Sequence, residues 1–552
     1  MEKTARRAGE HPAVLLAAGA MALSGVLLLH WFTRITFWRD EWGFLLHRRG
    51  WSVGTFLDPA VEHLAAIPIL IYKLLLGITG MDSPRAYQVV AVLFFLLTVA
   101  LLFIYARERV GEWLALAGVL PILFLGPSWS DLLFPYQIGF FGSMACGLAA
   151  LLCLDRRTRG WDIAATVLLC AGLLFSDAGI PFVAGVALEV ALGRERFRRA
   201  YIVAVPTVLW IIWYLGWGHT AHTFVSVHNA ANLPSYVVDG LSTSLSSWLG
   251  LNNTVAGVQT GPLEWGRPLL VLAALMVGFR WYRLGRPSDR ALGTLAVWLG
   301  FWSLTALDAS VFGPPTASRY IYMGVLLMVL FASEVMKGVR LPVWATATVV
   351  AVATAAAVAN YTTLRDAVPT LATIAQQERG GLAALELARN HVDPGLLLVP
   401  QNSDVDYLGL VDAGSYLSAV DAYGSPAYTP AELAGAPEVA RVAADKVSGA
   451  ALRIHPAPGT ITAGQRCLKV DVSSGPTARV PAGGLVIRPL GGGVQAGLRR
   501  YARASFPLSF GTLSRGQAQL LRITPDRSTV PWVLQLTGRG AAQVCPAEAP
   551  PS

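Results

Sequence analysis

Long apolar stretches recur along the first two-thirds of this chain, and only short charged segments separate them. Of its 552 residues, 14% are charged, whereas an ordinary soluble domain has about 25%. About eleven stretches approach the ~20 apolar residues that a helix needs to cross a membrane. The sequence therefore predicts a polytopic α-helical membrane protein. The predicted spans are residues 13–33, 86–106, 112–127, 137–154, 161–176, 178–193, 200–217, 264–282, 291–309, 320–336 and 341–361.

Basic residues gather in the segment after every second span, for example Arg156, Arg157 and Arg159. Short cytoplasmic loops collect Lys and Arg. We therefore expect a multi-pass protein of the plasma (inner) membrane with a cytoplasmic N-terminus and, after an odd number of spans, an extracytoplasmic tail. In a soluble protein a net charge of +9 would suggest nucleic acid. Here the basic residues serve as topology determinants, and no nucleic-acid partner is expected.

The composition becomes ordinary where the last span ends, and three regions are predicted. These are a transmembrane domain at 1–362, an extracytoplasmic α/β connecting region at 363–450 and a small β-rich domain at 451–552. In the last region short apolar runs alternate with Gly and Pro turns, which is typical of a β-sandwich or jelly-roll. Cys467 and Cys545 both lie there, and two cysteines in an exported domain are predicted to form a disulfide.

Segments outside the spans also carry secondary-structure signals. Residues 62–79 are apolar but interrupted by Pro68 and Lys73, which favours a helix lying along the membrane surface. Residues 218–263, rich in Ser, Asn and His, are expected to form a long outer loop. In the tail, helical periodicity covers 364–391, and a short apolar run at 395–400 indicates a strand.

Two adjacent acids stand beside tryptophans directly after the first span, in the segment Trp38-Arg39-Asp40-Glu41-Trp42. Partial desolvation at a membrane surface keeps a carboxylate basic enough to accept a hydroxyl proton. The pair is therefore a candidate general base or metal-binding site. The alternative is a solvated helix exit with an aromatic belt.

Other candidates are less specific. His219, His222 and His228 crowd one loop, and two histidines three residues apart could hold a metal, although solvated loop histidines are the plainer interpretation. Asp177 and Asp308 stand at the outer ends of predicted spans. They are either polar helix ends or residues of a cavity.

Four short strings resemble the GT-C superfamily of membrane glycosyltransferases, including uncharacterised bacterial members. The strings are RDEWGFL at 39–45, EHLAAIPILIYKLLLGI at 62–78, FPYQIGFF at 134–141 and SRYIYMG at 318–324. The resemblance covers roughly residues 10–365. It implies a GT-C-like membrane domain that uses polyprenyl-phosphate-linked sugars on the outer face of the membrane.

The resemblance also implies roles for single residues. Asp40 matches the catalytic base of the family, with Glu41 as the second member of the pair. Asp131 lies where metal-using members carry a second acidic motif, but this chain has Trp-Ser-Asp there. No cofactor is certain, and a divalent metal such as Mg or Mn, held by Asp40 and Asp131, stays open.

Further residues are expected around the substrates. Those expected to line the cavity or the acceptor site are Glu62, His63, Asp131, Tyr136 and Gln137. Glu62 and His63 have an alternative reading as charges that pair with a helix N-terminus.

A polyprenyl phosphate needs a cation at the level of its headgroup, and Lys73 and Arg319 are the two candidates. A lone lysine in an apolar helix also snorkels to the interface without any ligand.

The function expected from this pattern is an inverting transfer of a sugar from a polyprenyl-phosphate donor to an extracytoplasmic acceptor, with Asp40 as base. The acceptor is a glycan, lipid or protein of the cell envelope. A lipid-linked glycan flippase or other transporter is the alternative, and a nonenzymatic envelope-assembly protein is the third. Transporters place ionisable residues near the middle of the membrane, whereas here charges in the middle of the spans are almost absent, apart from Glu189, and the acids gather at the outer surface.

Overall fold

The computed structural model describes residues 11–60, 62–221, 225–252, 264–308, 313–398, 411–462, 465–481 and 483–547. The chain divides into two compact units. The first contains residues 1–35, 48–75 and 85–371, and the second joins 36–47 and 76–84 to 372–552. This division differs from the three regions expected from the sequence, because parts of 34–85, the predicted first outer loop, fold with the tail.

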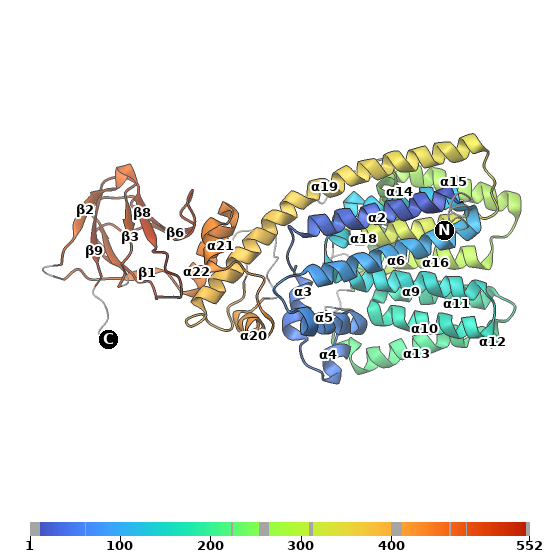
Figure 1. Cartoon of the computed structure of the whole chain (residues 1–552), viewed down its shortest axis with the longest axis horizontal. Helices are drawn as coiled ribbons and strands as arrows, with labels where there is room; N and C mark the ends of the chain where they lie inside the picture. Colours follow the sequence, from blue (N-terminus) through green and yellow to red (C-terminus); the bar gives the residue numbers. More distant parts are fainter. Residues whose placement is uncertain are drawn as a thin grey trace, which may run out of the picture. The chain divides into compact units, whose positions relative to one another are not determined.

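The first unit is built from long helices that lie side by side (Figure 1). Among the described residues, six helices are long and apolar enough to cross a membrane, and a bent pair at 112–124 and 126–132 would make a seventh. The chain is therefore a multi-pass membrane protein. The longer helices are α2 Pro12–Phe32, α6 Arg85–Val110, α7 Glu112–Val119, α9 Ile138–Asp155, α10 Arg159–Phe175, α11 Ile180–Leu192, α13 Tyr201–Gly216, α14 Val227–Trp248, α15 Gly266–Leu284, α16 Asp289–Leu307, α18 Ser318–Val335 and α19 Val343–Ala388.

Shorter helices connect these elements. The surface helix expected at 62–79 is present as α5, although it begins only at Ala66. The shorter helices are α3 Asp40–Trp42, the π-helix η1 Gly43–His47, α4 Val53–Leu57, α5 Ala66–Thr79, η2 Ile122–Phe124, η3 Gly126–Ser128, α8 Trp129–Leu132, η4 Pro135–Gln137, η5 Asp177–Gly179, α12 Arg196–Arg199 and η6 Gly218–Thr220.

Every predicted span falls on a helix, but the predicted number of about eleven exceeds the six or seven that satisfy length and apolarity. The difference arises from short helices. For example, α11 has 13 residues and α13 has 16, and a helix rises only ~1.5 Å per residue.

Helix α14 corrects the expectation that residues 218–263 form a loop. It has 22 residues and packs against α15, α16 and α18. Its buried positions are mostly small and hydroxylated: Ser242, Thr243, Ser244, Ser246 and Ser247 are at most 1% exposed. Small residues let helix backbones approach closely within a membrane bundle. The helix is polar in composition because it packs on neighbouring helices and not on lipid.

An ion-pair network joins five helices of the first unit. Arg109 of α6 pairs with Glu334 of α18 and lies 2.6 Å from Asp155 of α9. Arg290 of α16 lies 3.2 Å from Asp155 and 2.6 Å from Glu189 of α11. Buried charges are costly unless they are paired. The one charge expected in the middle of a span, Glu189, therefore has a structural partner.

Helix α19 runs through the boundary expected at residue 362 without a break and contains 46 residues. In the first unit, Asn360 donates a hydrogen bond of 2.9 Å to the carbonyl of Ser247, and the ring of Tyr361 contacts that of Trp31 at 5.8 Å. The two helical segments that the sequence suggests at 341–361 and 364–391 are thus one element.

Among the described residues, the second unit continues with three α-helices and nine β-strands. The helices are α20 Ala413–Tyr423, α21 Pro430–Gly435 and α22 Glu438–Ala451. The strand expected at 395–400 appears only as a single bridge between Leu397 and Asp412, and 399–410 lie outside the described residues. The strands are β1 Pro456–Pro458, β2 Leu468–Asp471, β3 Thr477–Arg479, β4 Leu485–Pro489, β5 Gln495–Arg499, β6 Leu508–Thr512, β7 Gln519–Leu521, β8 Val533–Thr537 and β9 Ala541–Pro546.

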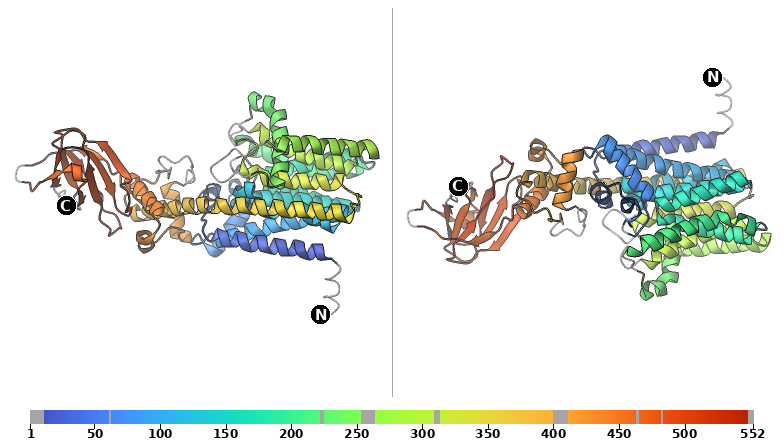
Figure 2. Two further views of the ribbon diagram at one scale, coloured as in Figure 1. Left: turned by 90° about the horizontal axis from the view of Figure 1, so that it is seen from above. Right: turned by 90° about the horizontal axis from the view of Figure 1, so that it is seen from below.

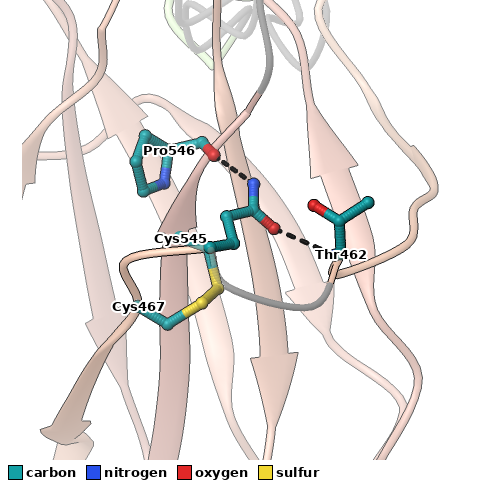
Figure 3. Close-up of a disulfide and its surroundings, with 5 residues drawn as sticks. Thr462, Cys467, Cys545 and Pro546 are labelled. Carbon is teal, nitrogen blue, oxygen red and sulfur yellow. Dashed lines mark hydrogen bonds between the residues drawn. A yellow bond between two sulfur atoms is a disulfide. The ribbon is translucent and has the colours of Figure 1, made fainter.

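The strands form two antiparallel sheets, with orders β1-β7-β4-β9-β2 and β3-β8-β5-β6. Figure 2 shows the strands in orange and red. A disulfide joins Cys467, just before β2, to Cys545 in β9 (Figure 3). Buried Asp445 of α22 accepts hydrogen bonds from the backbone of Arg500 and Tyr501, and so attaches α22 to the segment that follows β5.

Candidate functional site

The acidic pair lies in the second unit, on a locally irregular backbone. Arg39 has a φ of 33°, which non-glycine residues rarely adopt, and Asp40 begins the three-residue helix α3. The π-helix η1 follows directly. Such strained or widened turns persist only where the surrounding structure enforces them, and they concentrate at functional sites.

The two acids differ in their surroundings. Asp40 is partly buried, whereas Glu41 is 0% exposed. The Oε2 atom of Glu41 accepts a 2.9 Å hydrogen bond from the backbone N–H of Trp38. Glu41 therefore stabilises the start of α3, and Asp40 is the more accessible carboxylate.

The tail supplies the packing around this segment. The ring of Trp42 is 0% exposed, contacts Phe37 and Tyr416 edge-on, and donates its indole N–H to Glu378. All of these residues belong to the second unit. The sequence gives no sign of the roles of Glu378 and Tyr416, because α19 and α20 carry them far along the chain from Trp42.

A second group of titratable side chains assembles in the first unit. His63 Nδ1 lies 3.1 Å from the Oδ2 atom of Asp177, at the start of η5. Glu62 interacts electrostatically with His63, Asp177 and Asp308, the residue that caps α16. Glu62 and His63 are expected near a substrate, and the structure groups them with Asp177 and Asp308. For these two acids the sequence left two interpretations open, polar helix ends or residues of a cavity.

Burial changes the proton affinity of this group. Burial, together with the charges of Asp308 and Asp177, raises the pKa of Glu62 to about 7, although His63 acts in the opposite direction. Burial lowers the pKa of His63, but the hydrogen bond to Asp177 and the neighbouring carboxylates outweigh it, so this pKa ends above its usual value. A carboxyl group with a pKa near neutrality can both accept and donate a proton.

Arg319 and Asp131 lie beside this group. Tyr320 interacts electrostatically with Arg319, Asp308, Glu62 and Asp131, and therefore connects them. Asp131 is 1% exposed, and its Oδ2 accepts a 2.6 Å hydrogen bond from a serine of η3. Arg319 is thus a cation of the first unit that interacts electrostatically with Asp131 and Tyr320.

Lys73, expected as a phosphate contact, has internal partners in the structure. Its ammonium group donates to the carbonyls of Arg48, Arg49 and Gly50 and lies 4.4 Å from the ring centre of Trp51. An ammonium group has three hydrogens, and all three have internal acceptors. Lys73 therefore braces the loop before α4.

The remaining predicted residues are placed individually. Tyr136 is partly buried and Gln137 is 8% exposed, both in η4. His219 lies near the carbonyl of Tyr214, and His228 near Asn232, so they do not converge. His222 lies outside the described residues. In the part of the chain that the structure describes, no group of three or more His, Cys, Asp or Glu side chains is arranged to hold a metal ion.

The predicted site residues thus fall into two sets. Asp40 and Glu41 belong to the second unit, while Glu62, His63 and Arg319 belong to the first, as do the remaining acceptor-site candidates. Within the first unit, the structure brings together residues from three distant segments, at 62–63, 177 and 308.

Comparisons with known proteins add little to this geometry. No protein-family model and no curated protein matches the chain. Among solved structures, the chain is similar to ArnT from Cupriavidus metallidurans bound to undecaprenyl phosphate, with 14% sequence identity and a TM-score of 0.43 over 75% of this chain and 88% of that one. A likeness at this level carries no argument about function, so the proposals below rest on this chain's own residues.

Proposed function

We propose that this protein is a glycosyltransferase that moves a sugar from a polyprenyl-phosphate donor to an acceptor hydroxyl outside the cytoplasm. The observation that carries the proposal is the backbone around Asp40. A non-glycine residue at positive φ precedes this acid and a π-helix follows it. Strain of this kind costs on the order of 1–3 kcal/mol, so a structural role alone gives no reason to keep it.

In the proposed reaction, Asp40 accepts the proton of the acceptor hydroxyl while the hydroxyl oxygen attacks the anomeric carbon. The bond from that carbon to the phosphate oxygen breaks, and polyprenyl phosphate leaves with the bonding electrons. A single displacement inverts the anomeric centre. Arg319 steadies the departing phosphate, because guanidinium groups bind phosphate oxygens with charge-assisted hydrogen bonds.

The group around Glu62 supports a role in acceptor binding. Hydroxyl groups of sugars need both donors and acceptors, and a carboxyl group whose pKa is about 7 supplies either one near neutral pH. The partly exposed imidazole of His63, held by Asp177, adds a second such group. Neither role requires a metal ion.

The proposed orientation keeps the N-terminus in the cytoplasm and the tail outside. Two observations support it: the basic loops after alternate spans, and the disulfide between Cys467 and Cys545, since such bonds persist in oxidising compartments. The acceptor is then a component of the cell envelope.

The experiment compares wild-type protein with Asp40→Asn. Purified protein is mixed with radiolabelled undecaprenyl-phosphate pentoses and hexoses as probes, and membranes from cells lacking the protein serve as acceptor. Wild type should release undecaprenyl phosphate and move label from lipid to glycan. Asp40→Asn should be slower by about 10²–10⁴, the usual contribution of a general base.

Asp421→Asn is the matched control, because Asp421 lies in the same unit but is 65% exposed and pairs only at the surface. It should transfer at the wild-type rate. A transporter would move the lipid-linked sugar between the membrane faces without releasing polyprenyl phosphate. An Asp40→Asn protein as fast as wild type would show that Asp40 is not the base.

A further inference from the structure

We propose that Glu378 is a positioning residue: through the indole of Trp42 it fixes the helix that carries Asp40. The inference rests on the proposed function, because it assumes that Asp40 is the base. All three residues belong to the second unit. Trp42 and Asp40 are the two ends of the three-residue helix α3, so a displacement of the indole moves the carboxylate as well.

The indole is held from several directions. Its N–H donates to Oε1 of Glu378. The ring of Phe37 contacts it at 5.5 Å and that of Tyr416 at 5.9 Å, both edge-on. The hydroxyl of Tyr416 in turn donates a 2.7 Å hydrogen bond to Glu386. A short helix cannot hold itself in place, since three residues form almost no internal hydrogen bonds. These contacts therefore determine where α3 lies.

Burying the carboxyl group of Glu378 costs free energy, and packing alone would not require such a group. It is 0% exposed, and among the described residues its Oε2 has no hydrogen-bond partner. Glu41, also 0% exposed, lies within electrostatic range of it. An unpaired buried charge is costly, and glutamine keeps the shape of glutamate without the charge. A glutamine at this position would satisfy the indole equally well, so we expect the Glu378→Gln variant to fold.

The test is a double-mutant cycle between Trp42 and Asp40. Trp42→Phe keeps an aromatic ring, smaller than the indole, and removes the N–H, so α3 loses its link to Glu378. With the undecaprenyl-phosphate sugars as probe donors, Trp42→Phe should lower kcat by about 10–100-fold with KM unchanged, the usual effect of a small misplacement of a catalytic group. In the Asp40→Asn background the same change should cost nothing further, because the group that it misplaces no longer acts.

Substitutions of Glu378 give an independent measure. Glu378→Gln keeps an acceptor for the indole and should retain most of the turnover, whereas Glu378→Ala should match Trp42→Phe. The Glu378→Gln and Trp42→Phe results decide the question even if Glu378→Ala does not fold. Thermal midpoints and the Cys467–Cys545 disulfide report that each variant is folded.

Two results would overturn the inference. One is a wild-type kcat for Trp42→Phe. The other is an equal loss in the wild-type and Asp40→Asn backgrounds, which would show that the indole acts on folding or on another group. Failure of the proposed function looks different, because Asp40→Asn by itself would then transfer sugar at the wild-type rate.

Discussion

Neutralising Glu62 should make the protein more stable at alkaline pH. Its pKa is raised from 4.5 to about 7, mainly by burial and then by Asp308. The folded state therefore prefers the protonated carboxyl. The stability that this preference contributes is fully present below pH 4.5 and is lost as the pH rises through about 7. In Glu62→Gln the side chain stays neutral at every pH, so this loss should not occur.

The size of the effect follows from the same values. At ~1.4 kcal/mol for each pH unit, a rise from 4.5 to about 7 corresponds to roughly 3 kcal/mol at most. Glu62 is partly exposed, and solvent screens part of the interaction, which leaves about 1–2 kcal/mol. The variant and wild type should therefore unfold at the same temperature at pH 4 and separate progressively up to pH 8, with the variant higher.

Tryptophan fluorescence during heating in detergent measures this difference, since the chain contains 17 tryptophans. The control is Glu264→Gln, because Glu264 is an exposed glutamate of the same unit. It should follow the wild-type curve at every pH. The reasoning is refuted if the wild-type and Glu62→Gln midpoints stay parallel from pH 4 to pH 8, or if the variant falls below wild type at pH 8.

Three further outcomes are expected. Arg319→Ala should raise the KM for the undecaprenyl-phosphate donor about tenfold or more with a smaller change in kcat, because a phosphate loses its charge-assisted partner; an unchanged KM would remove this assignment. Lys73→Ala should instead lower the thermal midpoint at nearly constant KM, since the carbonyls that it bridges lose a buried donor at a cost of about 1–3 kcal/mol. In intact cells Cys467 and Cys545 should resist alkylation until a reductant is added, and Cys467→Ser should destabilise the β-stranded region by about 2–4 kcal/mol. Thiols that react without reductant would contradict an exported tail.

The helices were predictable to the extent that they are apolar along their length. A helix surrounded by acyl chains must be apolar along its length, so α2 and α6 stand out in the sequence. Helix α14 escapes this rule, because its buried positions face other helices and are filled by serine and threonine. A hydropathy pattern therefore misses a helix whose buried positions carry small hydroxylated side chains, whereas it finds α18, which is buried but apolar. The sequence also does not show that α19 is one uninterrupted helix, because the composition changes between its two halves while the helical backbone continues.

The sequence indicated single residues of the candidate site but not the contacts between them. The adjacent acids Asp40 and Glu41 could be recognised in the sequence, because they stand beside tryptophans directly after the first predicted span. The role of Lys73 could not be recognised in the sequence, because its partners are backbone carbonyls, which every residue possesses. Asp177 was visible but ambiguous, and only the 3.1 Å approach to His63 decides between a helix end and a member of a cluster.

The second unit changes what the C-terminal region can be taken to do. If the C-terminal region were a separate module after the membrane domain, only neighbouring loop residues would hold the segment around Asp40. Instead Glu378 and Tyr416 bury the indole of Trp42, and Asp82 of the first outer loop accepts a 2.8 Å hydrogen bond from the backbone of Ser425. These partners lie more than 300 residues apart along the chain. Since the region contributes packing to the segment with the strained backbone, it determines the position of the proposed base even though no acid of its own takes part in the proposed chemistry.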